Sequence, residues 1–490
     1  MTKKWLSLLG LVAYLACPGQ TFTTAAGVSA EAVKKREAGE VTAATPVQYP
    51  HVSRARTPRL PKDYYWMQMN NGLEVVVIEN HKVPLATIEI AVKNGSYTEG
   101  PEYSGLSHLF EHMFFKANKD YPDQEKFIQR TEELGMIWNG TTGDERVNYF
   151  FTFDKDSLAA GLRFMNAAIR FPIYRTEDMQ KERPVVDGEF QRGESDPFFQ
   201  LWMEVNKKVW GDLFTRKNAI GDHDVINTAT PEKMMIIKDK YYFPNNSILV
   251  ICGDVKHNEA FAYAELIYGD WKPSDFNPHE KYPIPEFAPI AKTEYLIKES
   301  SIAQTPYVMY TWQGPDTRND SISTLAADVF STILGLNSSK WQQALVDKGL
   351  ASSVGLNYQT LKHVGPVSIF AIPNPGKLKE FTSELINQVN HFADDDYFTD
   401  EQLQTAKDIL RRNQIRNTEK PSSLASNLTY WWCSASLDFF TDYLKGMMSI
   451  TRADIQNYLR KYVINKPYIA GMIINEEMNK ELKPREYFKN

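Results

Sequence analysis

The chain of 490 residues has only three cysteines, no run of basic residues, and no apolar stretch of the roughly 20 residues that a membrane helix needs. Three widely spaced cysteines exclude a disulfide-stabilised scaffold. A formal net charge of −6 without a basic cluster gives no reason to expect nucleic acid as a partner. What remains is an average globular composition, 42% hydrophobic and 24% charged, and a length that predicts two or three domains.

The N-terminus has the organisation of a secretory signal. Two lysines precede an apolar run at residues 5–16, and small and polar residues follow. We therefore predict a signal peptide at residues 1–27 and an exported protein, periplasmic or extracellular, with an N-terminal amphipathic or buried helix as the alternative. Cys17 would carry a lipid in a lipoprotein, although the residues before it fit a lipobox poorly; only that lipid would bring the chain to a membrane. Residues 28–57 predict a flexible leader.

Apolar patterns after the leader predict strands first and helices next. The expected strands cover residues 73–78, 85–92 and 147–153, and a helix is expected from about 104 to 116. Further helical segments follow to about residue 170. Strands followed by runs of helices predict an α+β fold rather than alternating β-α-β units.

Two parts of the chain repeat the same order of features. Residues 230–253 and 451–474 each combine an amphipathic helix, a turn and an apolar strand, and the two align without a gap. Thr176-Glu177-Asp178 and Thr399-Asp400-Glu401 each open a helix and are separated by almost the same distance along the chain. Two matches at nearly one offset predict an internal duplication.

The duplication divides the chain at its proline-rich stretch. Residues 272–289 lie between the two copies and form the expected linker. We predict two homologous mixed α/β domains, an N-terminal one at residues 58–271 and a C-terminal one at residues 290–490.

One short motif combines residue types that can bind a metal ion and activate water. His108 and His112 lie one helical turn apart in the sequence His-Leu-Phe-Glu-His, so both imidazoles can reach one metal ion. Glu111 lies on nearly the same face, where it can activate a water bound to that ion. The surrounding residues are strongly apolar, and two histidines and a glutamate in a buried helix are costly unless they are paired or bound to metal. The motif predicts one zinc ion per chain in the N-terminal domain.

A catalytic zinc needs a third protein ligand and an open position for water. Downstream carboxylates in a helical context are Glu182, Asp187, Glu189 and Glu194. Glu182 and Glu189 are seven residues apart and share one helical face, so either can bind the metal while the other orients a histidine. The spacing leaves both assignments open.

His-x-x-Glu-His is the inverzincin signature. Residues 65 to 480 resemble the pitrilysin/insulin-degrading enzyme family of metallopeptidases, particularly its small members related to mitochondrial processing peptidase. The resemblance rests on Asn71-Gly72-Leu73, Gly95-Ser96 with Glu99, Gly105-Leu106, Glu111 to Lys116, Asn139-x-x-Thr142 with Glu145 and Tyr149, and Glu182-Arg183-x-Val185-Val186-x-x-Glu189. It implies two homologous α+β domains that form one half of a clamshell chamber.

The same resemblance assigns roles. It makes Glu189 the third zinc ligand and Glu182 the partner of a ligand. Pro184 departs from a regular helix, since it should kink the ligand helix or mark its first turn. An extended peptide would pair along the strand from Thr142 to Tyr149. The residues implied to bind substrate are Asn139, Thr142, Glu145 and Tyr149.

The C-terminal domain, which lacks a metal motif, departs from the family pattern. Members that complete the site there carry an Arg and a Tyr seven residues apart, whereas this chain has Leu345 and Ser352. The resemblance therefore implies a homologous, metal-less partner subunit that supplies the Arg and the Tyr. The remaining histidines after the leader are expected at the surface or in turns, namely His81, His223, His257, His279, His363 and His391.

These features predict a zinc metalloendopeptidase that cuts extended or unfolded peptides together with a partner subunit. Glu111 is the expected general base, which passes its proton to the leaving amine. The alternatives are a non-catalytic structural subunit of the same family and a peptide-binding or chaperone subunit with a vestigial zinc site. Zinc content together with peptide cleavage separates the three.

Overall fold

A computed structural model describes residue 49 and residues 52–489 of the chain. The predicted signal peptide, Cys17 and most of the predicted leader lie outside these residues. The end of that leader is bound to the first domain, because Val52 is buried and the Ala55 N–H donates to the Gln68 side chain at 2.9 Å. These contacts hold Val52 and Ala55, near the end of the predicted leader, against the first domain. Within the described part of the chain, no helix has the length and apolar character needed to cross a membrane.

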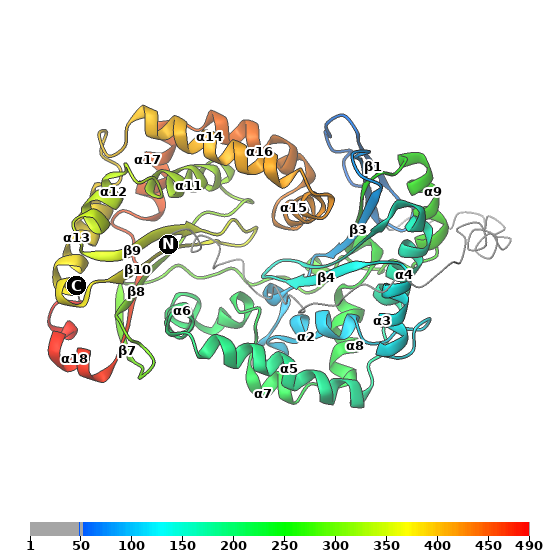
Figure 1. The fold of residues 1–490 in the computed structure, drawn as a ribbon, viewed down its shortest axis with the longest axis horizontal. Coiled ribbons are helices and arrows are strands. Elements are labelled where there is room, and N and C mark those ends of the chain that lie inside the picture. Colours follow the sequence, from blue (N-terminus) through cyan, green and yellow to red (C-terminus); the bar gives the residue numbers. More distant parts are fainter. Residues whose placement is uncertain (1–48, 50–51, 490) are drawn as a thin grey trace.

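Two mixed sheets form the framework of the molecule (Figure 1). The first has six strands in the order β1-β2-β6-β3-β5-β4, and the second has five in the order β7-β11-β8-β10-β9. The first sheet consists of β1 (Tyr64–Gln68), β2 (Glu74–Glu79), β3 (Leu85–Val92), β4 (Ile137–Thr142), β5 (Val147–Asp154) and β6 (Ser247–Gly253). The second consists of β7 (Glu294–Glu299), β8 (Tyr307–Gln313), β9 (Ala351–Tyr358), β10 (Pro366–Pro373) and β11 (Ile469–Ile474).

Helices surround both sheets, which confirms the predicted α+β class. Those of the first half are α2 (Leu106–Phe114), α3 (Gln124–Glu133), α4 (Leu158–Arg170), α5 (Thr176–Glu194), α6 (Pro197–Trp210), α7 (His223–Asn227), α8 (Pro231–Tyr241), α9 (His257–Tyr268) and α10 (Pro278–Lys281). Those of the second half are α11 (Ser321–Leu334), α12 (Lys340–Gln342), α13 (Leu378–His391), α14 (Asp400–Asn417), α15 (Pro421–Ser434), α16 (Leu437–Ser449), α17 (Arg452–Tyr462) and α18 (Glu476–Leu482).

The second sheet repeats the first, strand by strand. In each, one parallel pair is followed by three antiparallel pairs, so that β2, β6, β3, β5 and β4 correspond to β7, β11, β8, β10 and β9. The registers agree too. Ile88 pairs with Ile251 in the first sheet, and Val308 pairs with Met472 at the matching place in the second. The chain therefore consists of two homologous domains.

Each domain covers one face of the other domain's sheet. Helix α6 of the first half packs on β8 and β11, and Gly471 makes room for it, since a Cβ there would lie 2.4 Å from Val205. Helix α15 of the second half packs on β3 and β6, with Leu428 and Trp432 against Val250. Figure 1 shows α15 lying beside the first sheet and α6 beside the second. Neither sheet is covered on both faces without the other domain.

Candidate metal centre

Helix α2 buries its apolar residues on one side and carries the motif on the other. Its apolar residues are fully buried in the core of the first domain, namely Leu106, Leu109, Phe110, Met113 and Phe114. His108, Glu111 and His112 point the other way, toward α5 and β4, which contact α2. The helical spacing therefore brings three polar side chains to one face, as the sequence predicts.

Side-chain atoms of three residues converge beside this face. The Nε2 atoms of His108 and His112 lie 3.3 Å apart, and Glu189 Oε2 on α5 lies 3.6 Å from the first and 3.7 Å from the second. Among the described residues, this is the one group of three or more His, Cys, Asp or Glu side chains close enough to hold a metal ion. The ligand atoms of a tetrahedral zinc, at bond lengths of about 2.0–2.1 Å, lie about 3.3–3.4 Å apart. The observed triangle is close to that size.

The protonation of His108 and the surroundings of Glu189 also fit a metal ion. Burial, followed by the charge on His112, lowers the pKa of His108 to about 3, so its imidazole stays neutral and keeps a lone pair for a metal. Glu189 Oε1 is buried without a hydrogen-bond partner. An unpaired buried carboxylate oxygen is costly, and a divalent cation removes that cost. Two imidazoles and one carboxylate are a donor set that zinc accepts.

Glu182 binds one of the histidines and not the metal position itself. Its Oε1 accepts a hydrogen bond from His112 Nδ1 at 2.9 Å, and Lys116 pairs with its Oε2. Burial raises the pKa of Glu182, but the bonds from His112 and Lys116 outweigh it and hold that pKa below its ordinary value. The ionised carboxylate fixes the tautomer that leaves His112 Nε2 free. Pro184 lies inside α5, past its first turn, and the helix continues beyond it.

Glu111 lies beside the three candidate ligands with one oxygen held in place. Thr142 Oγ1 donates to Glu111 Oε2 at 3.0 Å. Gly140 on β4 leaves room for the carboxylate, since a Cβ there would lie 2.7 Å from Glu111 Cγ and 2.9 Å from its Oε1. Burial raises the pKa of Glu111 to about 7, against the lowering effect of His112. A carboxyl group with such a pKa can take up and release a proton near neutral pH.

Two family models match the chain and divide it between them. Residues 74–212 match "Insulinase (Peptidase family M16)", and residues 228–410 match "Peptidase M16 inactive domain". The first range holds the candidate metal centre, and the second holds most of the second sheet. The chain belongs to peptidase family M16.

Sequence relatives of this M16 chain include proteins named as zinc proteases, and solved structures of proteases share its fold. An uncharacterized zinc protease from Rickettsia felis is 25% identical over 72% of this chain and 83% of its own length. The crystal structure of a protease from Helicobacter pylori matches 85% of this chain and 100% of its own, with a TM-score of 0.75 and 21% identity. The periplasmic protease PqqL from Escherichia coli matches 89% of this chain but only 51% of its own, with a TM-score of 0.68 and 15% identity.

The predicted substrate-binding residues of this M16 chain lie in two environments. Asn139 is partly exposed on β4, the outermost strand of the first sheet. The other three are buried and hydrogen bonded inside the protein, Thr142 to Glu111, Glu145 to His363 and Tyr149 to Tyr242. Contact with substrate stays a prediction for Asn139. It stays a prediction for the buried three as well, which also have partners inside the protein.

The strand open to a peptide differs from the predicted one. Strand β5 is already paired with β3 on one side and β4 on the other, and residues 143–146 form the turn between β4 and β5. No free edge runs from Thr142 to Tyr149, so that prediction is wrong. Among the described strands, the edge on this side of the sheet is β4, which begins at Ile137 with 71% of that residue's surface exposed.

The two positions that depart from the M16 pattern offer no strong donor. Leu345 is fully buried in the core of the second domain. Ser352 is exposed on β9, and its hydroxyl donates to the Ile372 carbonyl at 3.2 Å. Neither residue provides a cation or a phenol.

Three features of the site were missed by reasoning from the sequence. Gly140 makes room for Glu111, Lys116 neutralises Glu182, and His363 lies in a turn as expected but is bonded to the buried Glu145. Lys116 follows His112 by one helical turn, so its spacing could have indicated the contact. The other two contacts depend on how strands and domains meet, for which the sequence carries no signal.

Proposed function

We propose that this chain is a zinc-dependent endopeptidase that hydrolyses extended or unfolded peptides. The observation that carries the proposal is the convergence of His108, His112 and Glu189 within 4.8 Å of one another, next to Glu111. A zinc ion bound there supplies an activated water and polarises a carbonyl group. Structural zinc sites are closed by four protein ligands, whereas the three candidate ligands here leave a fourth position open for water, and Glu111 beside them is the base that a hydrolytic site requires.

The side chains of the centre have two roles, proton transfer and the orientation of a metal ligand. Glu111 takes a proton at its free carboxylate oxygen and delivers it to the leaving amine, while Thr142 holds the other oxygen. Glu182 holds the Nδ1 proton of His112, with Lys116 balancing its charge. The burial of these groups keeps bulk water from competing for the proton.

The free edge of β4 is the place where a peptide can bind. Its backbone N–H and C=O groups can pair with an added strand, and the same strand carries Gly140 and Thr142, which contact Glu111. Such pairing requires an extended substrate. The proposal therefore includes peptides and unfolded segments as substrates and excludes compact folded proteins.

A homologous, metal-less partner subunit completes the proposal. Leu345 and Ser352 leave this chain without a cation or phenol to polarise the substrate carbonyl. This chain accounts for 51% of the PqqL chain from E. coli, so that longer protein holds a second portion in one polypeptide. A partner that closes over the site would form the other half of the chamber. The signal-like residues 1–27 support a periplasmic or extracellular location for both subunits.

The deciding experiment measures metal content and cleavage together. Purified protein should hold about one zinc per chain, and Glu189→Gln should lose most of it. Glu111→Gln should keep the zinc and lose roughly 10²-fold or more in turnover of an unstructured peptide. A Glu111→Gln variant that cleaves like the wild type would sink the proposal, and peptide binding without any cleavage, with or without a partner, would favour the chaperone alternative.

The partner is tested with the same assay. The isolated chain should turn over slowly, because each donor aimed at the developing oxyanion contributes roughly 10²–10³-fold in hydrolases. Adding a homologous subunit that carries the Arg and Tyr should raise turnover by that order. Full activity of the isolated chain, unchanged by any homologous subunit, would contradict the partner and leave the peptidase proposal standing.

A further inference from the structure

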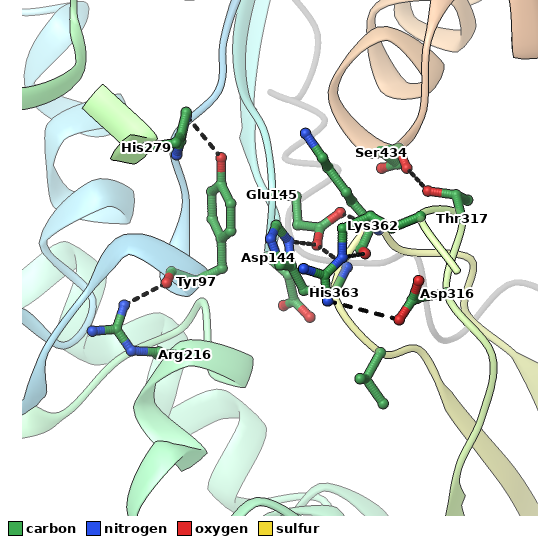
Figure 2. A network of polar contacts seen from close by, with 12 residues as sticks. Tyr97, Asp144, Glu145, Arg216, His279, Asp316, Thr317, Lys362, His363 and Ser434 are labelled. Carbon is green, nitrogen blue, oxygen red and sulfur yellow. Dashed lines mark hydrogen bonds and ion pairs between the residues drawn. The ribbon is translucent and has the colours of Figure 1, made fainter. Parts of the chain in front are cut away.

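The turns of two equivalent hairpins meet between the domains. Residues 143–146 join β4 to β5 in the first domain, and residues 359–365 join β9 to β10 in the second. Glu145, which is buried, accepts hydrogen bonds from the N–H groups of Lys362 at 2.7 Å and His363 at 2.8 Å, and from His363 Nδ1 at 2.9 Å. Figure 2 shows the Glu145 carboxylate facing these two residues. One carboxylate of the first domain thus binds three donors of the second.

The first domain holds the same turn from another direction. The buried Lys217 donates through Nζ to the carbonyl oxygens of His363 at 2.6 Å and Val364 at 2.9 Å. Val364 has a φ of +43°, a left-handed conformation that is unfavourable for a β-branched residue. Such a conformation persists only where its surroundings impose it. The contact between the domains therefore fixes the shape of the turn at residues 359–365.

The other side of the first-domain turn is bonded to the loop that leads into the metal-binding helix. Tyr97 N donates to the Asp144 carbonyl at 3.0 Å, and Ser96 N donates to the Gly143 carbonyl at 3.3 Å. Gly95 allows this approach, because its φ is +147° and a Cβ there would lie 2.3 Å from the Gly143 oxygen. The loop at residues 95–99 is therefore seated on the turn that carries Glu145.

Glu99 connects that loop to helix α2. Its two carboxylate oxygens accept hydrogen bonds from Gly105 N at 2.7 Å and Ser107 N at 2.6 Å, and the side chain is buried. Gly105 precedes the helix and has no side chain, so Glu99 satisfies N–H groups that the helix start leaves unpaired. Ser107 comes directly before His108, which places the cap one residue from a candidate ligand.

We propose that Glu145 and Glu99 are positioning residues through which the second domain fixes the metal-binding helix. The contacts form one buried series, from the turn at His363 through Glu145, Tyr97 and Glu99 to the start of α2. This inference rests on the proposed metal centre. It gives the domain without a metal motif a task in the chemistry of the other domain.

The physical reason lies in the origin of the ligands. His108 and His112 come from α2, whereas Glu189 comes from α5, so a small shift of α2 changes all distances in the centre. Displacements of about 1 Å can cost roughly 10²-fold in rate. Glu111 moves with α2 while β4 and a peptide on it do not. Loss of either positioning residue should therefore lower kcat more than it changes KM.

The test uses cobalt in place of zinc, because its visible absorption reports the geometry of the ligands independently of activity. Full-length Glu145→Gln and Glu99→Gln should each alter the cobalt spectrum. Each should also lower the affinity for zinc by about tenfold, as measured by competition with a chelator. Their kcat should fall by about tenfold with KM within about twofold, and Glu145→Asp should recover part of the loss. Trp432→Phe is the matched control, since it removes another buried contact between the domains, the hydrogen bond from Trp432 Nε1 to Glu74 at 2.8 Å, which lies outside this series.

Each outcome decides the inference. Normal cobalt spectra and zinc affinity in folded Glu145→Gln and Glu99→Gln would overturn it, and so would an equal change in Trp432→Phe. If Glu145→Gln does not fold, His363→Ala removes only one of the three bonds and should still shift zinc affinity by about twofold. A wild type that binds neither cobalt nor zinc would overturn the proposed function and this inference together, whereas metal binding by the wild type with unchanged variants overturns the inference alone.

Discussion

The two domains share one topology and differ in what their corresponding helices carry. Helix α2 presents two histidines and a glutamate, whereas α11, which follows the corresponding strand of the second sheet, has no histidine and a single carboxylate, Asp328. The difference continues on the next pair of helices. When Thr176, which opens α5, is aligned with Thr399, the residue before α14, Thr405 and Arg412 stand where α5 has Glu182 and Glu189.

The strands beside these helices differ in the same sense. Gly140 pairs with Tyr149 in the first sheet. The counterpart of Tyr149 in the second sheet is Ile369, and Ile369 pairs with Leu356. The first domain thus leaves a space for Glu111 where the second places a buried leucine. The comparison teaches that the fold provides a helix facing a strand. A few residues decide whether the space between them holds the side chains of a metal centre or apolar side chains of the core.

The largest effect should come from making the first domain resemble the second at this strand. Gly140→Ala puts a methyl group 2.7 Å from Glu111 Cγ, so the carboxylate must move away from its bond with Thr142. We expect kcat to fall by roughly 10²-fold, as for other displacements of about 1 Å, while zinc content stays at the wild-type level. Peptide turnover and metal analysis check this.

Gly143→Ala is the matched control for that variant. A Cβ at Gly143 has 3.9 Å to its nearest neighbour, the Arg146 carbonyl, so this variant should keep its turnover. Equal losses in both variants would mean that the sheet edge, and not the room for Glu111, is sensitive.

A smaller effect is expected at the support of the metal. Glu182→Gln replaces the carboxylate that holds His112 Nδ1 with a neutral amide and leaves Lys116 without its counter-charge. The loss of such a partner costs roughly 10–100-fold in metal affinity. Competition with a chelator measures it, with Glu177→Gln, an exposed position on the same helix, as the control. Unchanged affinity in Glu182→Gln would show that the hydrogen bond does not orient the ligand.

The sequence predicted the repeated elements well because their signals are local. Apolar alternation and the turn pair at residues 71–72 predicted β3 at its observed bounds and β2 within one residue. The helical spacing of the motif predicted which side chains converge on α2, since that depends on one element only. The choice of Glu189 over Glu182 came from family resemblance, and the geometry agrees with it because only Glu189 lies near both Nε2 atoms.

What the sequence did not predict depends on contacts between elements far apart in the chain. The exchange of α6 and α15 between the sheets has no local signal, because an amphipathic helix does not reveal which apolar face it meets. The edge position of β4 was also missed. A strand pattern fixes which side chains alternate, but the order of strands in a sheet follows from tertiary packing.

The smallest expected effect separates the two domains by their stability. Asp328 on α11 is partly buried, and its carboxylate accepts a hydrogen bond from the Tyr443 hydroxyl at 2.7 Å. Burial raises its pKa from 3.8 to about 7, with the Tyr443 bond acting in the opposite direction. The first domain uses its buried polar groups for a metal centre, whereas the Asp328 carboxyl group destabilises the second domain when it ionises.

Asp328→Asn tests this destabilisation through the pH dependence of the melting temperature. At a pH below 3.8 the acid is protonated in both states, so it does not affect the balance. Between pH 3.8 and about 7 the folded protein retains a proton that the unfolded chain loses, so the stability of the wild type falls as the pH rises and stays lower above pH 7.

The amide of Asp328→Asn cannot ionise and still accepts the Tyr443 hydrogen bond. We therefore expect Asp328→Asn to melt above the wild type at pH 8, by about 2–4 °C for each kcal/mol relieved, with the gap closing toward pH 4. Exposed Asp394→Asn should show no such trend, and zinc content should be unchanged in both. Parallel melting curves of Asp328→Asn and wild type across this range would contradict the raised pKa.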